Sequence, residues 1–541
     1  GGDQHLPAAI PQRFSEHLLR LPGAVDVGGV AQVDAGLHAH VHLASVHHPL
    51  WQRKLMSILT ERLPNTQYVA TAHSPLVAQA AADAAVTLGK MANEETGYGV
   101  PEHKTLKNLL SSQLLWEAIK DIPTVGVIRS DPQKHTYDIA WPMGVVAALT
   151  PSTNPTSTTM YKTLIAVKAK NAIVIAPHPF AAKCCAETIR IMAEAGERAG
   201  MPKGLISCMT NVSLPGTQEL MKHKYVALIL ATGGSDMVRA AHSVGKPAYG
   251  VGPGNVPAYV DRSADVQRAA KYIVASKAFD HSVICATEQA VVADRPIAAR
   301  LEELMKAEGA YFVDDNIKQI LAKNLFVGHL PNPKSVGRSP QQLAQMYGFS
   351  VPDWARILVV RLNGVGREEP LSGEKLTTVL GWYEVDGWEA GCDRSIELIN
   401  YGGRGHSLVI HAQDENVIMR FGLEKPVFRI VVNTFGTLGT TGYTTGVMPA
   451  MTLGSGGVGG AITGDNISVH HLYNIKKLAY EIRTAPEAAF APGSTDDPAQ
   501  RRMFTGGSYA APATTSSNNS SANMDAQVEE IVRKVLLELK K

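Results

Sequence analysis

The sequence predicts an α/β protein built on two doubly wound parallel sheets, one after the other along the chain. Between about Thr124 and Asp294, short apolar runs such as NAIVIAP and VALILAT alternate with amphipathic stretches such as PFAAKCCAETIRIMAEAG. The apolar runs lack polar–apolar alternation, which is typical of strands covered on both faces by crossover helices. The same rhythm resumes after Asp294, in IAARLEELMKAEGA, RILVVRL and FRIVVNT. A second α/β unit is therefore expected to follow the first.

The composition fits a large globular protein and argues against several functional classes. The chain has 541 residues, 45% of them apolar, and its 51 basic and 49 acidic residues nearly cancel. We therefore expect no nucleic-acid or membrane binding by bulk charge. No apolar run approaches the roughly 20 residues of a membrane helix. The five cysteines include no Cys-x-x-Cys pair, which argues against a zinc knuckle or a disulfide scaffold and favours the cytoplasm.

Residues 1–80 form an atypical N-terminal segment. Three histidines alternate in DAGLHAHVH: His38, His40 and His42. No carboxylate or thiolate stands at ligand spacing from them, so we expect no metal site. The segment resembles the C-terminal part of a P-loop ATPase domain, but no phosphate-binding loop precedes it and Ala35 stands where that family usually has glutamate. ATP hydrolysis is therefore not expected, and we interpret the junction near Gln79 as a gene fusion or an artificial join.

The C-terminal end has two parts of different character. Residues 497–523 are rich in Ser, Ala, Thr, Asn, Gly and Pro, which predicts a flexible linker. Residues 524–541 (MDAQVEEIVRKVLLELKK) carry apolar residues at helical spacing and charged residues mostly opposite them. We predict a tethered amphipathic helix that binds a partner. The alternative is a helix folded back on its own domain or on another copy of the chain.

Cys285 is the candidate nucleophile. It lies in FDHSVICATEQAVVAD, between a helical pattern and a strand-like run. An unpaired cysteine is more often an inert buried residue, so the neighbouring motifs decide. TPSTNPTST follows a strand and places Asn154 at the carboxyl edge of the sheet. ATGGSD makes a tight turn at a helix N-terminus, which suits a pyrophosphate, and YGVGPGNVPAYV is a glycine-rich strand exit.

Taken in order, the motifs TPSTNPTST, APHP, ATGGSD, GVGPGNVPAYVD, FDHSVICATEQ and NYGGRGHS resemble the CoA-acylating branch of the aldehyde dehydrogenase superfamily. The resemblance runs from about Met91 to about Tyr480 and implies a Rossmann-type NAD-binding domain and an α/β catalytic domain. The implied boundaries are 81–266 for the NAD-binding domain, completed by parts of 442–480; 267–441 for the catalytic domain; and 442–496 for the return to the NAD domain and an oligomerisation segment.

The resemblance implies a reaction. Cys285 would attack a short aldehyde, NAD would take the hydride, and the acyl group of the resulting thioester would pass to coenzyme A. The side-chain amide of Asn154 and the backbone N–H of Cys285 would stabilise the oxyanion. His406 is a candidate to assist CoA deprotonation, and a purely structural histidine is the alternative. Propionaldehyde and acetaldehyde are the expected substrates, with propionaldehyde favoured.

The resemblance also implies a set of cofactor-binding residues: Thr150, Pro151, His178, Pro179, Thr232, Gly233, Gly234, Ser235, Gly250, Gly252 and Glu374. Hydrolytic relatives carry a water-activating glutamate in a Glu-Leu-Gly-Gly motif, and the matching stretch here reads Gly250-Val251-Gly252-Pro253, with Gly250 in place of the glutamate. Without that base, the thioester is expected to persist until the CoA thiolate attacks it. A further departure is His281, which follows Asp280 where relatives often have asparagine, and we expect it to affect the shape of the aldehyde pocket.

Two other functions remain open at this stage: a hydrolytic aldehyde dehydrogenase, and an inactive fusion that acts through residues 524–541. Those residues resemble the encapsulation peptides that load such enzymes into bacterial microcompartments degrading propanediol, ethanolamine or choline. The resemblance therefore implies a location in a microcompartment lumen within the cytoplasm. It also implies a shell protein or the enzyme core as partner, and a homodimer or homotetramer.

Overall fold

The computed structural model describes residues 74–328, 330–486 and 489. The predicted linker 497–523, the predicted helix 524–541 and most of the segment 1–80 lie outside these residues. Within them, the predicted α/β class with two parallel sheets is confirmed. The helices in the described ranges all lack the combination of length and hydropathy needed to span a bilayer.

The smaller sheet has five parallel strands in the order β5-β4-β3-β6-β7. Their bounds are Val145–Thr150 for β3, Ala172–Pro177 for β4, Ile206–Cys208 for β5, Val226–Thr232 for β6 and Ala248–Val251 for β7. The chain winds outward from β3 first to one edge and then to the other, which is the order of a dinucleotide-binding sheet. The reversal lies between β3 and β6, where ligands bind in such sheets.

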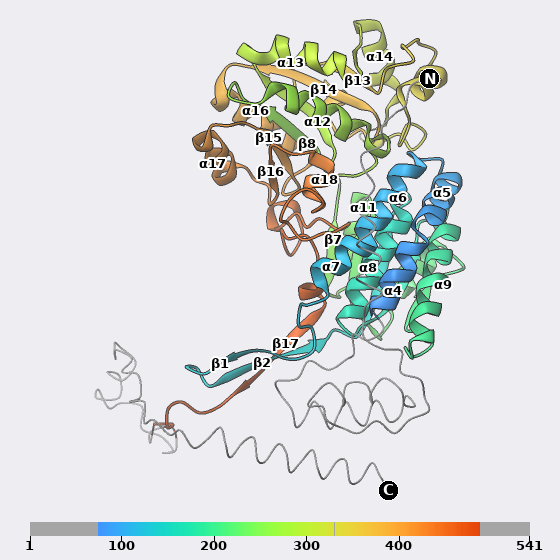
Figure 1. Cartoon of the computed structure of the whole chain (residues 1–541), viewed down its shortest axis with the longest axis vertical. Helices are drawn as coiled ribbons and strands as arrows, with labels where there is room; N and C mark the ends of the chain where they lie inside the picture. Colours follow the sequence, from blue (N-terminus) through green and yellow to red (C-terminus); the bar gives the residue numbers. More distant parts are fainter. Residues whose placement is uncertain (1–73, 329, 487–488, 490–541) are drawn as a thin grey trace, which may run out of the picture. The chain divides into compact units, whose positions relative to one another are not determined.

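Helices cover both faces of this sheet (Figure 1). Side chains of β3 alternate between two cores: Val146 and Ala148 face one, and Ala147 and Leu149 face the other. The first core is covered by α4 (Ser74–Asp83), α5 (Ala85–Thr96), α7 (Leu115–Ile119), α8 (Pro155–Lys168) and α9 (Ala182–Arg198), and α6 (Pro101–Leu109) packs beside α5. The second is covered by α10 (Leu214–Lys222) and α11 (Ser235–His242). All residues of α8 are buried, so it is the central helix of the lobe.

The predicted boundary at residue 80 and the predicted junction near Gln79 both fall inside α4. This helix runs unbroken from Ser74 to Asp83. Val77 and Ala81, one helical turn apart on either side of Gln79, are fully buried in the core that α8 also lines. The buried face of α4 therefore continues across the expected junction, and the residues from Ser74 onward are part of the smaller lobe.

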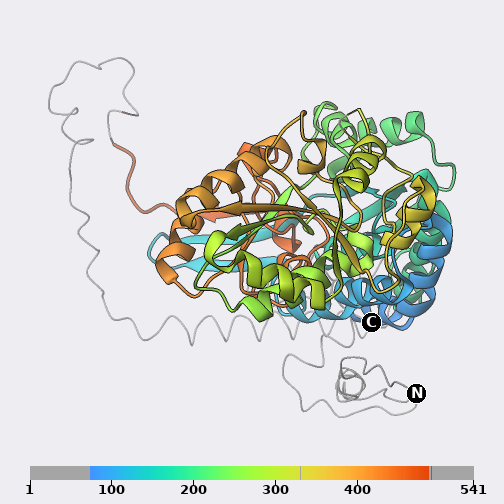
Figure 2. The same cartoon turned by 90° about the horizontal axis from the view of Figure 1, so that it is seen from above.

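The larger sheet has seven parallel strands in the order β10-β13-β14-β9-β8-β15-β16 (Figures 1 and 2). Their bounds are Val256–Val260 for β8, Glu288–Asp294 for β9, Ala310–Phe312 for β10, Ile357–Arg361 for β13, Val379–Val385 for β14, Leu408–His411 for β15 and Ile430–Val432 for β16. Because β8 pairs with β9 and β15, this sheet begins before the predicted boundary at residue 266. The sequence rhythm locates strands but does not show which sheet each strand joins.

Helices also cover both faces of the larger sheet. On one face lie α12 (Val266–Ala278) and α13 (Arg295–Ala307). On the other lie α14 (Asp315–Asn324), α15 (Pro340–Tyr347), α16 (Gly387–Gly402) and α17 (Glu415–Glu424). A small hairpin of β11 (Phe326–Val327) and β12 (Leu330–Pro331) and the short helix α18 (Gly436–Thr440) complete this part.

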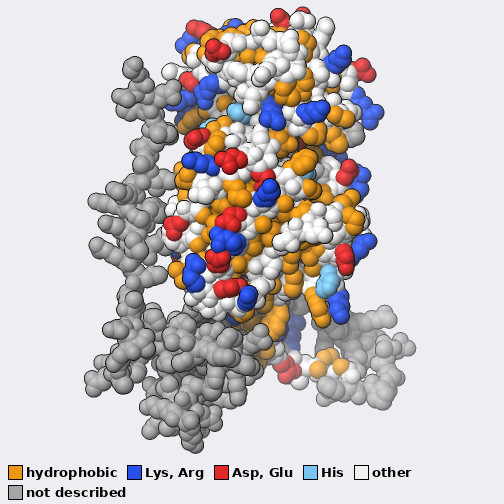
Figure 3. Space-filling view, turned by 90° about the vertical axis from the view of Figure 1, so that its right-hand side faces the viewer, with side chains coloured by type: hydrophobic (Ala, Val, Ile, Leu, Met, Phe, Trp, Pro, Cys, Tyr) orange, Lys and Arg blue, Asp and Glu red, His pale blue; other side chains and the backbone are white. Residues whose placement is uncertain are grey.

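The chain returns to the smaller lobe after α18. Met451, Leu453 and Ile467 pack into the core that α8 lines. The last strand, β17 (Tyr473–Ala479), then pairs antiparallel with β2 (Thr136–Pro142), which pairs with β1 (Gly126–Asp131). This three-stranded arm extends from the lobe in Figure 1. On the face drawn in Figure 3, basic and acidic side chains are interspersed, as the near balance of charge in the sequence leads one to expect.

Candidate active site

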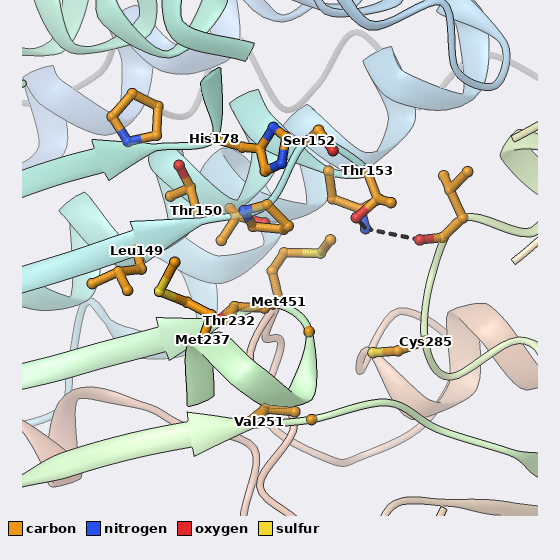
Figure 4. A pocket seen from close by; sticks show the side chains of 18 of the residues that line it. Leu149, Thr150, Ser152, Thr153, His178, Thr232, Met237, Val251, Cys285 and Met451 are labelled. Carbon is orange, nitrogen blue, oxygen red and sulfur yellow. Dashed lines mark hydrogen bonds between the residues drawn. The ribbon is translucent and has the colours of Figure 1, made fainter. Parts of the chain in front are cut away.

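A cavity of about 470 Å³ opens where strands β3, β4, β6 and β7 of the smaller sheet end. Most of the predicted site residues line it: Thr150, Pro151, Asn154, His178, Pro179, Thr232, Gly233, Gly234, Gly252, Cys285 and Glu374. Figure 4 shows Thr150, Thr232 and Val251 at the strand ends on one side and Cys285 on the other. The size is that of a small-molecule or cofactor site.

The turn between β6 and α11 has room for an anionic group. Gly234 precedes α11, and no side chain caps the first turn of the helix. A Cβ atom added at Gly234 would meet nothing within 4 Å, so the open space lies directly over the helix N-terminus. Uncapped N–H groups and the helix dipole favour a phosphate there. The turn therefore fits the pyrophosphate of a dinucleotide. Ser235, also predicted to bind the cofactor, begins α11 and does not line the cavity.

Gly250, which was predicted to bind the cofactor, does not line the cavity. A Cβ atom there would lie 2.6 Å from atoms of both His242 and Val238 in α11, so this glycine allows close packing of the helix against β7. Successive residues of a strand point to opposite faces. The next residue, Val251, is the one that lines the cavity. The end of β7 therefore presents an apolar side chain to the site and no carboxylate.

Cys285 lies on a constrained loop between the turn Phe279–Ser282 and β9. Asp280, His281 and Ser282 have φ values of 47°, 50° and 66°, a left-handed region that non-glycine residues seldom adopt. Strain of this kind is held in place by the surrounding structure and concentrates at functional sites. The His281 ring contacts the carbonyl oxygen of Gly337 at 3.0 Å and does not line the cavity. The expectation that His281 shapes the aldehyde pocket is therefore not supported.

His406 is in direct contact with the candidate nucleophile. Its Nε2 lies 3.2 Å from Cys285 Sγ, and its Nδ1 lies 3.0 Å from Ser407 Oγ. Burial, together with the charge of Arg429, lowers the pKa of His406 to about 3. Burial, with a smaller effect of Glu374, raises the pKa of the Cys285 thiol to about 12. At neutral pH the pair is therefore a thiol hydrogen-bonded to a neutral imidazole.

Glu374 is the only carboxylate among the described residues that line the cavity. Its Oε1 accepts a hydrogen bond of 3.1 Å from the backbone N–H of Gly254, and burial raises its pKa to about 8. The neighbouring Lys375 does not pair with it, because its ammonium donates to the carbonyl oxygens of Leu371 and Gly373. At neutral pH Glu374 is thus mostly protonated and can donate a hydrogen bond to a ligand hydroxyl or accept one from it.

Asn154 is held by a polar cluster that the sequence did not reveal. Its Nδ2 donates to the carbonyl oxygen of Val283 at 3.1 Å, the dashed line in Figure 4. Its Oδ1 accepts from the ammonium of Lys107 at 2.5 Å, and Lys107 also forms an ion pair with Asp280. Lys107 and Asp280 are separated by 173 residues, and a lysine in an amphipathic helix usually marks a solvated face. Spacing alone therefore gave no signal for this cluster.

Comparison with known proteins shows the family to which the chain belongs. The sequence model of the aldehyde dehydrogenase family matches residues 77–336 of this chain. The chain is also 36% identical over 404 residues to the succinate-semialdehyde dehydrogenase (acetylating) of Clostridium kluyveri, and the match covers 74% of this chain and 88% of that protein. The chain belongs to the aldehyde dehydrogenase family. The predicted fold, a Rossmann-type domain beside an α/β catalytic domain, is thereby confirmed.

Longer relatives and solved structures agree with this assignment. Aldehyde-alcohol dehydrogenase 2 of Entamoeba histolytica is 39% identical over 431 residues, which are 77% of this chain and 50% of that protein. The chain thus spans about half the length of the aldehyde-alcohol dehydrogenases that it matches. The crystal structure of an acetylating aldehyde dehydrogenase from Geobacillus thermoglucosidasius has a TM-score of 0.76 and 46% identity, and the match covers 81% of this chain and all (100%) of that one.

A more distant structure comes from a microcompartment. The propionaldehyde dehydrogenase of the Clostridium phytofermentans fucose utilisation bacterial microcompartment has a TM-score of 0.70 and 25% identity, and the match covers 79% of this chain and 97% of that one.

Proposed function

We propose that the chain oxidises a short-chain aldehyde, propionaldehyde or acetaldehyde, with NAD and transfers the acyl group to coenzyme A. The observation that carries the proposal is that Cys285, in contact with His406, lines a cavity at the strand ends of a dinucleotide-type sheet. The strand end that carries the water-activating glutamate in hydrolytic relatives presents Val251 to the cavity. A thioester on Cys285 then has no neighbouring base at that position to direct water toward it.

The geometry supports a sequence of steps. The Cys285 thiol passes its proton to His406 Nε2, 3.2 Å away, as the sulfur attacks the carbonyl carbon of the aldehyde. Since the pKa of His406 is about 3, the imidazole does not keep this proton, which leaves to solvent as the one proton that the overall oxidation releases. The new oxyanion accepts hydrogen bonds from Asn154 Nδ2 and the backbone N–H of Cys285.

Hydride loss from the same carbon then leaves an acyl group on Cys285. Bound NAD would supply the hydride acceptor. Thr232, Gly233 and Gly234 would hold its pyrophosphate, and Glu374 would hold a ribose hydroxyl. The CoA thiolate attacks the thioester carbon, the Cys285 thiolate leaves, and acyl-CoA is released. His406 would take the proton of the incoming thiol and return it to the leaving Cys285 sulfur, which it already contacts.

The test is NADH formation from propionaldehyde, with and without CoA, by the intact chain and by Cys285→Ala. Turnover is expected only with CoA present, and Cys285→Ala is expected to lose at least about a thousandfold in rate because the nucleophile is gone. CoA-independent NADH formation would instead support the hydrolytic alternative. No turnover by the wild-type chain would support a protein that acts only through its C-terminal residues.

We also propose that the enzyme is a homodimer or homotetramer in a microcompartment lumen. Apolar side chains on the arm support self-association, since Trp141, Ile475 and Leu478 are about half exposed there. The amphipathic pattern of residues 524–541 and the microcompartment relative support the location, with a shell protein or the enzyme core as partner.

A further inference from the structure

The orientation of the Asn154 amide is determined by two partners with opposite requirements. A lysine ammonium can only donate a hydrogen bond, so the atom that meets Lys107 must be the carbonyl oxygen, Oδ1. The backbone carbonyl of Val283 can only accept, so the atom that meets it must be Nδ2. The two contacts agree on one orientation, and an amide turned by 180° would lose both. Nδ2 keeps a second hydrogen, which has only the Thr153 hydroxyl as a neighbour, at 3.2 Å.

Lys107 is itself held in place by buried groups. Its ammonium contacts Asp280, whose other oxygen accepts from the backbone N–H of Val100 at 2.7 Å. Burial disfavours the charged form of Asp280, but Lys107 and Lys104 outweigh it and leave the pKa of this carboxyl below its usual value. Asp280 is fully buried and Lys107 nearly so, at 2% exposed. A buried pair of this kind holds its geometry because either charge alone would be poorly solvated.

We propose that Lys107 is a positioning residue for the reaction: with Asp280 behind it, Lys107 fixes the Asn154 amide so that Nδ2 faces the oxyanion formed on attack by Cys285. This inference rests on the proposed function. The ammonium also polarises the amide through Oδ1, which makes the Nδ2 hydrogens better donors. The cluster connects α6 to the loop that carries the nucleophile, because Asp280 lies five positions before Cys285 in the sequence.

Lys104 provides a matched control. It lies one turn before Lys107 on α6, is equally buried, and pairs with the same carboxylate oxygen of Asp280 at 3.2 Å. Its other contact is the backbone carbonyl of Thr153, at 3.4 Å, and not the Asn154 side chain. Removal of either lysine leaves Asp280 with one ammonium partner. Lys104→Met therefore removes one ion pair to Asp280, as Lys107→Met does. It leaves the contact between Lys107 and the Asn154 amide intact.

The experiment measures acylation of Cys285 by p-nitrophenyl propionate, as the burst of nitrophenolate, in the full chain without NAD or CoA. This step forms an oxyanion at the same carbon position but needs neither hydride transfer nor CoA. Lys107→Met is expected to lower the acylation rate constant at least about tenfold, a part of the 100- to 1000-fold effect of a lost oxyanion-hole donor. Lys104→Met is expected to stay within about twofold of wild type, and Lys107→Arg, which keeps a charged donor, to recover most of the rate.

A double-mutant cycle separates positioning from a structural role. If Lys107 acts through Asn154, Lys107→Met should add nothing to the loss in Asn154→Ala. Losses that multiply, or equal rates for Lys107→Met and Lys104→Met, would overturn the inference. If thermal melting shows that Lys107→Met is unfolded, Lys107→Gln replaces it in the same double-mutant cycle. A chain that forms no acyl-CoA but shows the expected burst pattern would contradict the proposed function alone.

Discussion

At the scale of single residues, burial determines the chemistry of the site. Cys285 and His406 touch, yet both rest in the neutral form, because the surrounding protein disfavours thiolate and imidazolium alike. Without a ligand, the protein therefore holds Cys285 as a neutral thiol. The thiolate is favoured only when a ligand in the cavity offsets its charge, so the sulfur should react slowly with other electrophiles while the cavity is empty of ligand.

This protonation state predicts how Cys285 reacts with alkylating agents in the absence of ligands. Since the thiolate is the reacting species and the thiol pKa is about 12, the rate of inactivation by iodoacetamide should rise about tenfold per pH unit between about pH 7 and 9.5. The measurement is loss of NADH-forming activity against time at each pH, with peptide mapping to assign the modified cysteine. A plateau below about pH 9 would mean that the thiol is activated already in the free protein.

The residues of the motifs could be predicted from the sequence, but the side chains that contact them in the folded protein could not. Thr232 ends strand β6 and Asn154 follows β3, at the edge of a parallel sheet where ligands bind, and Cys285 lies in a recognisable motif before β9. Whether Gly250 or Val251 faces the cavity depends on the direction of side chains at the end of β7, which a motif does not specify. The contact of His406 with Cys285 joins residues 121 positions apart, so the sequence alone could not show that this histidine lies beside the candidate nucleophile.

At the scale of elements, apolar runs gave most strands of the two sheets, because doubly covered strands need continuous burial. The assignment of β8 to the larger sheet and of α4 to the smaller lobe depends on long-range pairing, which local periodicity does not contain. The loop between α5 and α6 is a similar case. Gly97 and Gly99 both have left-handed backbone, with φ of 68° and 71°, but only Gly99 lies against the Asp280 carboxylate.

Gly99→Ala should therefore damage the site more than Gly97→Ala. An added Cβ would lie 1.9 Å from Asp280 Oδ1 at position 99, whereas at position 97 its nearest neighbour would be the Arg338 guanidinium, at 3.7 Å. Both changes carry the same backbone strain, so their difference isolates the displaced carboxylate. We expect Gly99→Ala to lose about 1–3 kcal/mol more unfolding free energy than Gly97→Ala and to acylate more slowly. Urea denaturation measures the first and the nitrophenolate burst the second. Equal stabilities would show that Asp280 has room to move.

At the scale of the whole molecule, the cavity joins elements far apart in the sequence. The strand ends of the smaller sheet, the Cys285 loop and Glu374 all contribute to its lining, and Met451 and Leu453 reach it from the returning chain. A ligand in the cavity therefore contacts segments that are brought together only by complete folding. Binding to the native state alone shifts the unfolding equilibrium, so NAD should stabilise the protein as a whole.

The pyrophosphate position can be tested by placing a charge at the N-terminus of α11. In Gly234→Asp the new side chain enters open space, so the free protein should keep its melting temperature, while the carboxylate repels a phosphate. Wild type at roughly 100 times the NAD dissociation constant should gain about 2.7 kcal/mol, and Gly234→Asp should lose most of that gain. Gly422→Asp, on α17 and also in open space, is the control that should keep it. Thermal melting with and without NAD gives the comparison. Equal stabilisation of Gly234→Asp and wild type would place the pyrophosphate away from α11.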